Sequence, residues 1–303
     1  MIVEAKGLRK RYKDVWALDG LDLTVQEGEI YGLLGPNGSG KTTTILILLG
    51  LTEPTAGTVR VCGHDPAREP LAVKRLVGYL PEKVGFYEEL SAWENLRLIT
   101  SLNGIPEPEA KRRIAEALEQ VGLKEMARRP VATFSHGMRQ RLGIADVLVK
   151  KPKLAILDEP TSGIDPEGAV QILELIRQLR DEVGMTVILS SHLLYQVQRV
   201  CNRVGILHKG RMVAEGTVAE LTDSGGGLLA IVEGTTPKLR ARLEGEEWTI
   251  SVEDLGGGRV QVILEEGARE NLLQALVEEK ATLVELRPRT RTLEEIYLRY
   301  FQE

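Results

Sequence analysis

Short apolar runs alternate with longer amphipathic stretches over most of the chain. Three of the runs, at residues 31–35, 154–160 and 186–192, are apolar almost throughout, which is typical of strands covered on both faces. Between residues 82 and 150 the apolar positions recur with a helical period instead, which predicts helices. We therefore expect residues 1–222 to form an α/β domain into which a helical subdomain is inserted at about 82–150.

The pattern changes after a glycine-rich break, SGGG at residues 224–227, whose composition is typical of a hinge. Thr292 and Glu295 have the spacing of a capping box, which predicts that a final helix begins there. Residues 228–303 are expected to form a small C-terminal α+β domain. Its predicted strands are residues 228–234, 247–254 and 259–267, and its first predicted helix is residues 268–281.

The composition is that of an ordinary soluble protein: 303 residues, 43% hydrophobic and 27% charged, with a net charge of −5. The acidic balance argues against a nucleic-acid partner, because nucleic-acid-binding domains usually carry a basic surface. Cys62 and Cys201 lack the spacing of a metal site and are expected to be packed, reduced thiols. The N-terminus lacks the features of a signal peptide, and the apolar run Ile45–Leu51 is too short to span a bilayer. We expect a cytoplasmic protein that reaches a membrane only through a partner.

The segment GPNGSGKT fits the pattern G-x-x-x-x-G-K-[ST] between a predicted strand and a predicted helix. Glycines in such a loop let backbone N–H groups turn inward around phosphate oxygens. Lys41 is expected to reach the β- and γ-phosphates, and Thr42 to bind Mg²⁺ through its hydroxyl oxygen. The alternative is an accidental glycine-rich turn. The predicted nucleotide-binding residues here are Gly35, Pro36, Asn37, Gly38, Ser39, Gly40, Lys41, Thr42 and Thr43.

Two adjacent carboxylates, Asp158 and Glu159, end the second apolar run. Asp158 is positioned to hold Mg²⁺, and Glu159 to polarise an attacking water as the catalytic base. The alternative is a strand that simply ends in solvated acids. The sequence contains no N-K-x-D motif for guanine, which argues against a GTPase. ATP and Mg²⁺ are therefore the expected substrate and cofactor.

These motifs together resemble the nucleotide-binding subunit of an ABC transporter, and the resemblance extends through the first domain. It implies a P-loop ABC ATPase core. Ser162–Pro166 resembles the D-loop of that family, and His192 resembles the switch histidine that contacts the γ-phosphate. Tyr12 resembles the A-loop aromatic residue that stacks on adenine. A histidine satisfied at a strand end and a plain surface aromatic are the respective alternatives.

The segment FSHGMRQRL, at residues 134–142, has the serine, glycine and helix start of an anion site. It resembles the ABC signature motif, L-S-G-G-Q. The resemblance implies that two subunits pair head to tail, so that Ser135 and the Gly137 backbone cover the γ-phosphate bound to the other subunit. His136 and Met138 depart from the motif, because they stand where a glycine and a glutamine are usual.

Glu82, in the segment GYLPE, stands where the Q-loop glutamine of the family is expected. A carboxylate still meets Mg²⁺ through water, although it adds negative charge beside a triphosphate. The resemblance therefore implies a contact between Glu82 and both the nucleotide and the metal. The alternative is an acidic residue in a simple surface loop.

The form S-x-G-M-R-Q-R, followed by a compact tail, resembles subunits that pair with ABC-2 type membrane proteins, which export drugs, polysaccharides and lipids. The segments LPE, VGFYEELSAWENLRL and TLEEIYLRYF are similar to the ATPase of the nitrous-oxide-reductase copper-maturation transporter. The resemblance implies a homodimer at the cytoplasmic face of the membrane, an ABC-2 type membrane subunit and a periplasmic accessory protein. The competing function is a soluble ABC ATPase that acts on nucleic acid or the ribosome.

Overall fold

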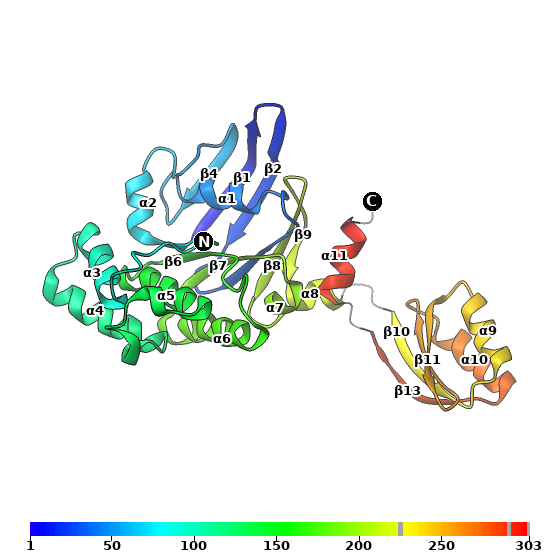
Figure 1. The fold of residues 1–303 in the computed structure, drawn as a ribbon. Helices are drawn as coiled ribbons and strands as arrows, with labels where there is room; N and C mark the ends of the chain where they lie inside the picture. The colour runs from blue at the N-terminus through cyan, green and yellow to red at the C-terminus, as the bar shows by residue number, and fades with distance from the viewer. Residues whose placement is uncertain (224–226, 290–291, 302–303) are drawn as a thin grey trace. The chain divides into compact units, whose positions relative to one another are not determined.

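The computed structural model describes residues 1–223, 227–289 and 292–301. The chain divides into two compact units, Met1–Val218 and Ala219–Glu303 (Figure 1). The first unit contains a six-stranded and a three-stranded sheet, and the second contains a four-stranded sheet. Among the described residues, no helix is both long and apolar enough to cross a membrane.

The main sheet of the first unit consists of buried, mostly parallel strands. Every residue of its three central strands is buried, as the continuous apolar runs predict. All neighbouring strands are parallel except the last pair. The strand order is β5 (Val77–Leu80), β6 (Leu154–Asp158), β7 (Thr186–Ser191), β3 (Ile30–Leu34), β8 (Arg203–His208) and β9 (Arg211–Thr217). The carboxyl ends of β3, β6 and β7 therefore lie at one edge of the sheet, where ligands bind in open α/β sheets.

An antiparallel sheet in the order β2 (Val15–Val25), β1 (Val3–Tyr12) and β4 (Ala56–Val61) completes the core of this unit. Its buried side chains share one hydrophobic cluster with helix α1 (Lys41–Leu48) and with β3. This packing brings the start of β2 against the loop that joins β3 to α1. The hairpin of β1 and β2 thus lies beside the glycine-rich segment.

Helices α3 (Ala92–Leu102), α4 (Glu107–Gln120) and α5 (His136–Val149) pack against one another at one end of the first unit (Figure 1). Ser91 and Glu94 form a capping box that fixes the start of α3. Helix α5 also packs against β5, which joins the helical segment to the main sheet. The remaining helices of this unit are α2 (Pro70–Leu76), α6 (Pro166–Val183) and α7 (Leu194–Gln198), and α8 (Val218–Asp223) spans the division between the units.

The second unit has a hydrophobic core of its own between an antiparallel sheet and two helices. Buried leucines from the helices, such as Leu239 and Leu272, meet buried strand residues such as Val262. The sheet has the order β11 (Thr249–Gly256), β12 (Arg259–Leu264), β10 (Leu228–Glu233) and β13 (Thr282–Pro288). The two helices of this core are α9 (Pro237–Gly245) and α10 (Arg269–Glu279), and α11 (Leu293–Phe301) follows β13 in the chain.

The sequence pattern misses two elements of this unit, α9 and β13. Helix α9 is short and rich in arginine, so it shows little helical periodicity despite its Thr236 cap. Strand β13 alternates weakly, and only two of its residues are not exposed. Of the predicted capping box of the last helix, one bond is present: the Glu295 N–H donates to the Thr292 hydroxyl at 3.2 Å, while the Glu295 carboxylate accepts from Arg289 at 2.6 Å.

Candidate active site

The glycine-rich loop connects the fully buried strand β3 to helix α1 and folds around the Lys41 side chain. The Lys41 ammonium donates to the carbonyl oxygens of Gly35, at 2.6 Å, and Pro36, at 3.3 Å. At Gly40, where φ is 114°, an added Cβ would lie 2.8 Å from the Ala17 carbonyl oxygen, so only glycine fits. The loop therefore holds a buried cation at the amino end of a helix, where anions are favoured.

The two carboxylates at the end of β6 face this cation. The Lys41 ammonium lies 3.8 Å from Oε1 of Glu159, and the other Glu159 oxygen lies 2.8 Å from Nδ1 of His192. Asp158 accepts a 2.5 Å hydrogen bond from the hydroxyl of Ser190 on the adjacent strand. Parallel pairing of β6 and β7 thus brings residues that are distant in sequence to one edge of the sheet.

Burial acts on both the acids and the cation of this cluster. Burial raises the pKa of Asp158, and the charge of Glu82 adds to this, while the Ser190 hydrogen bond and Lys41 act against it. Burial also lowers the pKa of Lys41, against the attraction of Glu159 and Asp158. A bound phosphate would favour the charged form of Lys41, and a bound cation would favour that of Asp158. The site is suited to accept both together.

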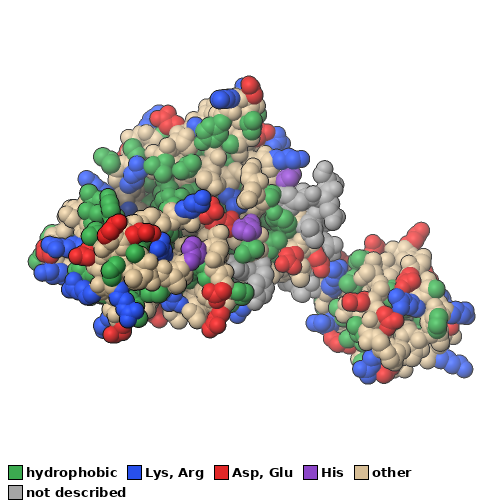
Figure 2. Space-filling view, in the orientation of Figure 1, with side chains coloured by type: hydrophobic (Ala, Val, Ile, Leu, Met, Phe, Trp, Pro, Cys, Tyr) green, Lys and Arg blue, Asp and Glu red, His purple; other side chains and the backbone are tan. Residues whose placement is uncertain are grey.

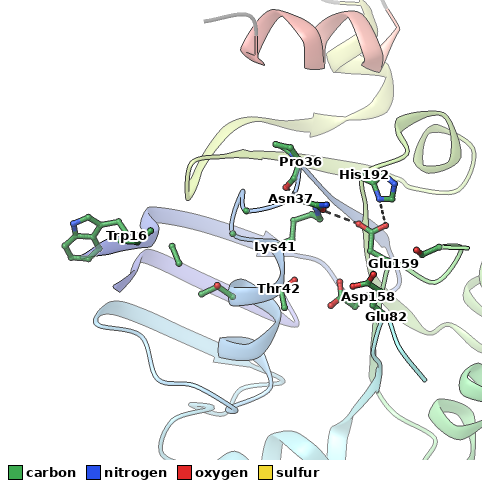
Figure 3. Close-up of a pocket in the computed structure, with 15 residues that line it drawn as sticks. Trp16, Pro36, Asn37, Lys41, Thr42, Glu82, Asp158, Glu159 and His192 are labelled. Carbon is green, nitrogen blue, oxygen red and sulfur yellow. Dashed lines mark hydrogen bonds and ion pairs between the residues drawn. The ribbon is translucent and has the colours of Figure 1, made fainter. Parts of the chain in front are cut away.

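A cavity of about 520 Å³ opens along this cluster (Figure 3). Glu82, Asp158, Glu159 and His192 gather at one end of it, Lys41 lies in the middle, and Trp16 lies at the far end. The lining residues are Val15, Trp16, Ala17, Pro36, Asn37, Gly38, Gly40, Lys41, Thr42, Thr43, Glu82, Asp158, Glu159, Ser162 and His192. The structure thus brings most of the predicted loop residues together with Glu82, both acids and the histidine.

The residues present fit a magnesium nucleotide. The hydroxyl of Ser39, buried in the loop, has no hydrogen-bond partner among the described residues, which suits a site that gains an oxygen-rich ligand. Thr42, Asp158 and Glu82 offer the oxygen atoms that Mg²⁺ prefers. Across residues 1–223, 227–289 and 292–301, no group of three or more His, Cys, Asp or Glu side chains could hold a metal by itself. That is the usual case for Mg²⁺, which relies on phosphates and water as well.

Tyr12 is not among the residues that line the cavity, whereas Trp16 is. The two residues lie on opposite strands of the hairpin, where Tyr12 pairs with Val15 and Arg11 with Trp16. Both aromatic side chains are partly exposed, and the Lys10 ammonium lies 5.0 Å from the Tyr12 ring centroid. Tyr12, which the sequence predicts to contact adenine, therefore lies outside the lining of the cavity. Among the described residues that line the cavity, Trp16 is the aromatic one besides His192.

Ser135 and Gly137 lie outside this cavity, in a separate, shallower hollow of about 350 Å³ at the start of α5. The Ser135 hydroxyl caps that helix by accepting from the Met138 N–H at 3.3 Å. His136 is hydrogen-bonded through Nε2 to the Ser162 carbonyl at 2.9 Å. Ser162 itself lines the catalytic cavity, so this contact connects the two sites within one chain.

The chain is similar in sequence to known ATP-binding proteins. The family model described as ABC transporter matches residues 18–162. The linearmycin resistance ATP-binding protein LnrL of Bacillus subtilis is 41% identical over 226 residues, which cover 75% of this chain and 72% of that protein. The bacitracin transport ATP-binding protein BcrA of Bacillus licheniformis is 42% identical over 214 residues, 71% and 69% of the two chains.

Solved structures give the same result at lower sequence identity. One chain from the dimeric, post-hydrolysis structure of the ATP-binding cassette MJ0796, bound to ADP and Pi, matches with a TM-score of 0.64 at 27% identity, over 71% of this chain and 98% of that one. The fold and the cavity define an ATP-hydrolysing P-loop enzyme. More narrowly, this chain belongs to the ATP-binding subunits of ABC transporters.

Proposed function

We propose that this chain is the ATPase subunit of an ABC-2 type exporter, works as a head-to-tail pair, and drives a separate membrane subunit. The names of its relatives support export, since one is a linearmycin resistance protein and another a bacitracin transport protein. One observation carries the paired arrangement. Ser135 and Gly137 form a second anion-type site that does not reach the cavity around Lys41 in the same chain.

In the proposed mechanism Glu159 accepts a proton from the attacking water, because its carboxylate is buried beside the cavity and can be aimed by two neighbours. Lys41 binds the β- and γ-phosphate oxygens after leaving the loop carbonyls that it contacts here. His192 holds the second oxygen of Glu159 and meets the γ-phosphate. Thr42, Asp158 and Glu82 would hold Mg²⁺, which neutralises charge on the phosphates.

In this proposal Trp16 supplies the surface on which the adenine ring of ATP stacks. Trp16 lies at the end of the cavity opposite the carboxylates (Figure 3). When the third phosphate lies at Glu159, the adenine ring must lie at that opposite end, where an aromatic side chain can stack on it. Ser135 and the Gly137 backbone of one subunit cover the γ-phosphate held by the other. Closure then depends on the third phosphate, which couples the nucleotide to association.

The chain is proposed to act at the cytoplasmic face of the membrane, with residues 228–303 stabilising the dimer or contacting a partner. The narrower prediction of a copper-maturation transporter with a periplasmic accessory protein has no support from the relatives named above. The alternative, action on nucleic acid or the ribosome, is not favoured either. On the visible face of each unit, basic and acidic side chains are interspersed rather than gathered in a basic patch (Figure 2).

The test is the association of Glu159→Gln chains with Mg-ATP or Mg-ADP, followed by light scattering. We expect a doubled mass with ATP only, because this variant keeps the phosphate contacts and loses the base. A mass that does not change with ATP would contradict the paired arrangement. Recovery of the native chain with membranes, rather than with nucleic acid, would separate the exporter from the alternative function.

A further inference from the structure

Ser190 belongs to none of the predicted motifs, although it contacts both proposed catalytic carboxylate residues. It lies on β7, two residues before His192, and its side chain is completely buried. In the parallel register of β6 and β7, Ser190 is directly opposite Asp158. The residue is therefore fixed by the sheet itself, next to the point where β6 delivers its acids to the cavity.

The Ser190 hydroxyl is used as donor and as acceptor. It donates to Oδ1 of Asp158 at 2.5 Å and accepts from the Glu159 N–H at 3.0 Å. The Ser190 carbonyl oxygen also accepts from the same N–H at 3.2 Å. One residue thus orients the side chain of Asp158 and holds the backbone of Glu159.

The Glu159 backbone needs such support. Its φ of 48° lies in the left-handed region, which side-chain-bearing residues rarely adopt without external restraint. That conformation directs the carboxylate between Lys41 and His192, which it contacts at 3.8 Å and 2.8 Å. If the restraint were lost, the base would be less well aimed even though its chemistry is unchanged.

We propose that Ser190 is a positioning residue for ATP hydrolysis, whose hydroxyl orients Asp158 toward Mg²⁺ and fixes the backbone that presents Glu159. This inference rests on the roles proposed above for Asp158 and Glu159. It predicts two separable effects of losing the hydroxyl. The affinity for Mg²⁺ in the presence of ATP falls, and so does the turnover number, whereas ATP binding without Mg²⁺ does not change.

The experiment compares Ser190→Ala with the native full-length chain. We expect kcat to fall about 10-fold with KM for ATP within twofold, since a hydrogen bond to a charged group is lost. Binding of a fluorescent ATP analogue, titrated with Mg²⁺, is expected to need roughly 10-fold more metal. Ser190→Cys, which keeps the size but donates weakly, is expected to lie between the two.

Thr186→Val is the matched control, because it removes another buried hydroxyl bond on the same strand. Thr186 accepts from the Gly28 N–H at 2.9 Å at the opposite end of β7, away from the cavity. This variant is expected to keep native kcat and native Mg²⁺ dependence. If Thr186→Val and Ser190→Ala lose activity equally, Ser190 contributes only to the stability of the strand and the proposal fails.

Two reference variants distinguish this proposal from the assignment on which it rests. Asp158→Asn should weaken Mg²⁺ binding, and Glu159→Gln should abolish turnover, if their roles are right. Native behaviour of both would overturn the assignment itself. Loss of function in both, together with native kcat and Mg²⁺ dependence in Ser190→Ala, would overturn the inference on Ser190 alone.

Discussion

Two anion-type sites in one chain differ in how complete they are. At the glycine-rich loop, Lys41 and Glu159 are both at least 92% buried and contact each other in a cavity of about 520 Å³. At the start of α5, Ser135 and His136 are exposed around a hollow of about 350 Å³. The first site contains a buried cation, metal-type oxygens and a proposed base, whereas the second offers a helix end, one hydroxyl and Arg141, with Asp165 and Glu167 nearby.

This difference indicates what each site can do alone. The loop site can bind a nucleotide by itself, because buried charges interact strongly with a ligand that excludes water. The α5 site is exposed, and in the proposed pair it contacts a phosphate only when the loop site of the second subunit lies against it. Variants in the two sites should therefore separate binding and hydrolysis from association.

The largest effect is expected for Glu159→Gln. Turnover should fall by about 100-fold or more, because the substitution removes the proton acceptor. ATP affinity should stay near native, since the phosphate contacts of the loop remain. Steady-state hydrolysis and nucleotide binding measured on one preparation check both statements. Turnover near the native rate would exclude Glu159 as the base.

Lys41→Ala should act at an earlier step. In the proposed mechanism the buried ammonium binds the β- and γ-phosphates, so its removal should weaken ATP binding by roughly 10- to 100-fold. Equilibrium binding of ATP and AMP, measured by calorimetry, checks whether the lost affinity comes from contacts with the β- and γ-phosphates. AMP affinity serves as the control and should hardly change. Unchanged ATP affinity would remove the loop cation from its assigned role.

Ser135→Asp should affect association without affecting the loop site. Aspartate is as good a helix cap as serine, so α5 should keep its start. The added charge would meet the partner's triphosphate, and ATP-dependent dimerisation should weaken at least about 10-fold. Ser135→Asn caps equally well without charge and is the matched control. Equal dimerisation by both variants would contradict a phosphate contact at Ser135.

The smallest effect is expected where the adenine ring of ATP is proposed to stack. Trp16→Ala should weaken ATP binding by roughly fivefold to tenfold, because one stacking contact is lost. Tyr12→Ala should change it less than twofold, since Tyr12 does not line the cavity. Affinity measurements on the two variants side by side decide between them. A larger loss in Tyr12→Ala would restore the sequence-based assignment.

Much of the fold could be predicted because its signals are local. Continuous apolar runs predict β3, β6 and β7, and helical periodicity predicts α3, α4 and α5, all of which are present. The glycine-rich loop is recognisable from spacing alone, since a phosphate site needs glycines at defined positions. The place of Asp158 and Glu159 at the edge of the sheet likewise follows from the sequence, because the apolar run of β6 ends at Asp158 and Glu159 comes next.

What could not be predicted depends on packing between distant segments. The hairpin residue Trp16 reaches the cavity because the antiparallel sheet packs against the loop, and no local pattern of β2 encodes that contact. The Ser190 contacts depend on the register between β6 and β7, which are separated by helix α6. Even the hydrogen bond from His136 to Ser162 joins residues 26 positions apart.

The left-handed backbone at Glu159 has a consequence for which residue this position favours. A residue with φ of 48° costs roughly 1 kcal/mol or more unless it is glycine or asparagine. Replacing Glu159 by either of these would relieve the strain but remove the proposed proton acceptor. It would also leave the buried Lys41 ammonium without its carboxylate partner, which costs more than the strain. The backbone and the side chain of Glu159 therefore favour different residues at this position, and the side-chain contacts outweigh the backbone strain.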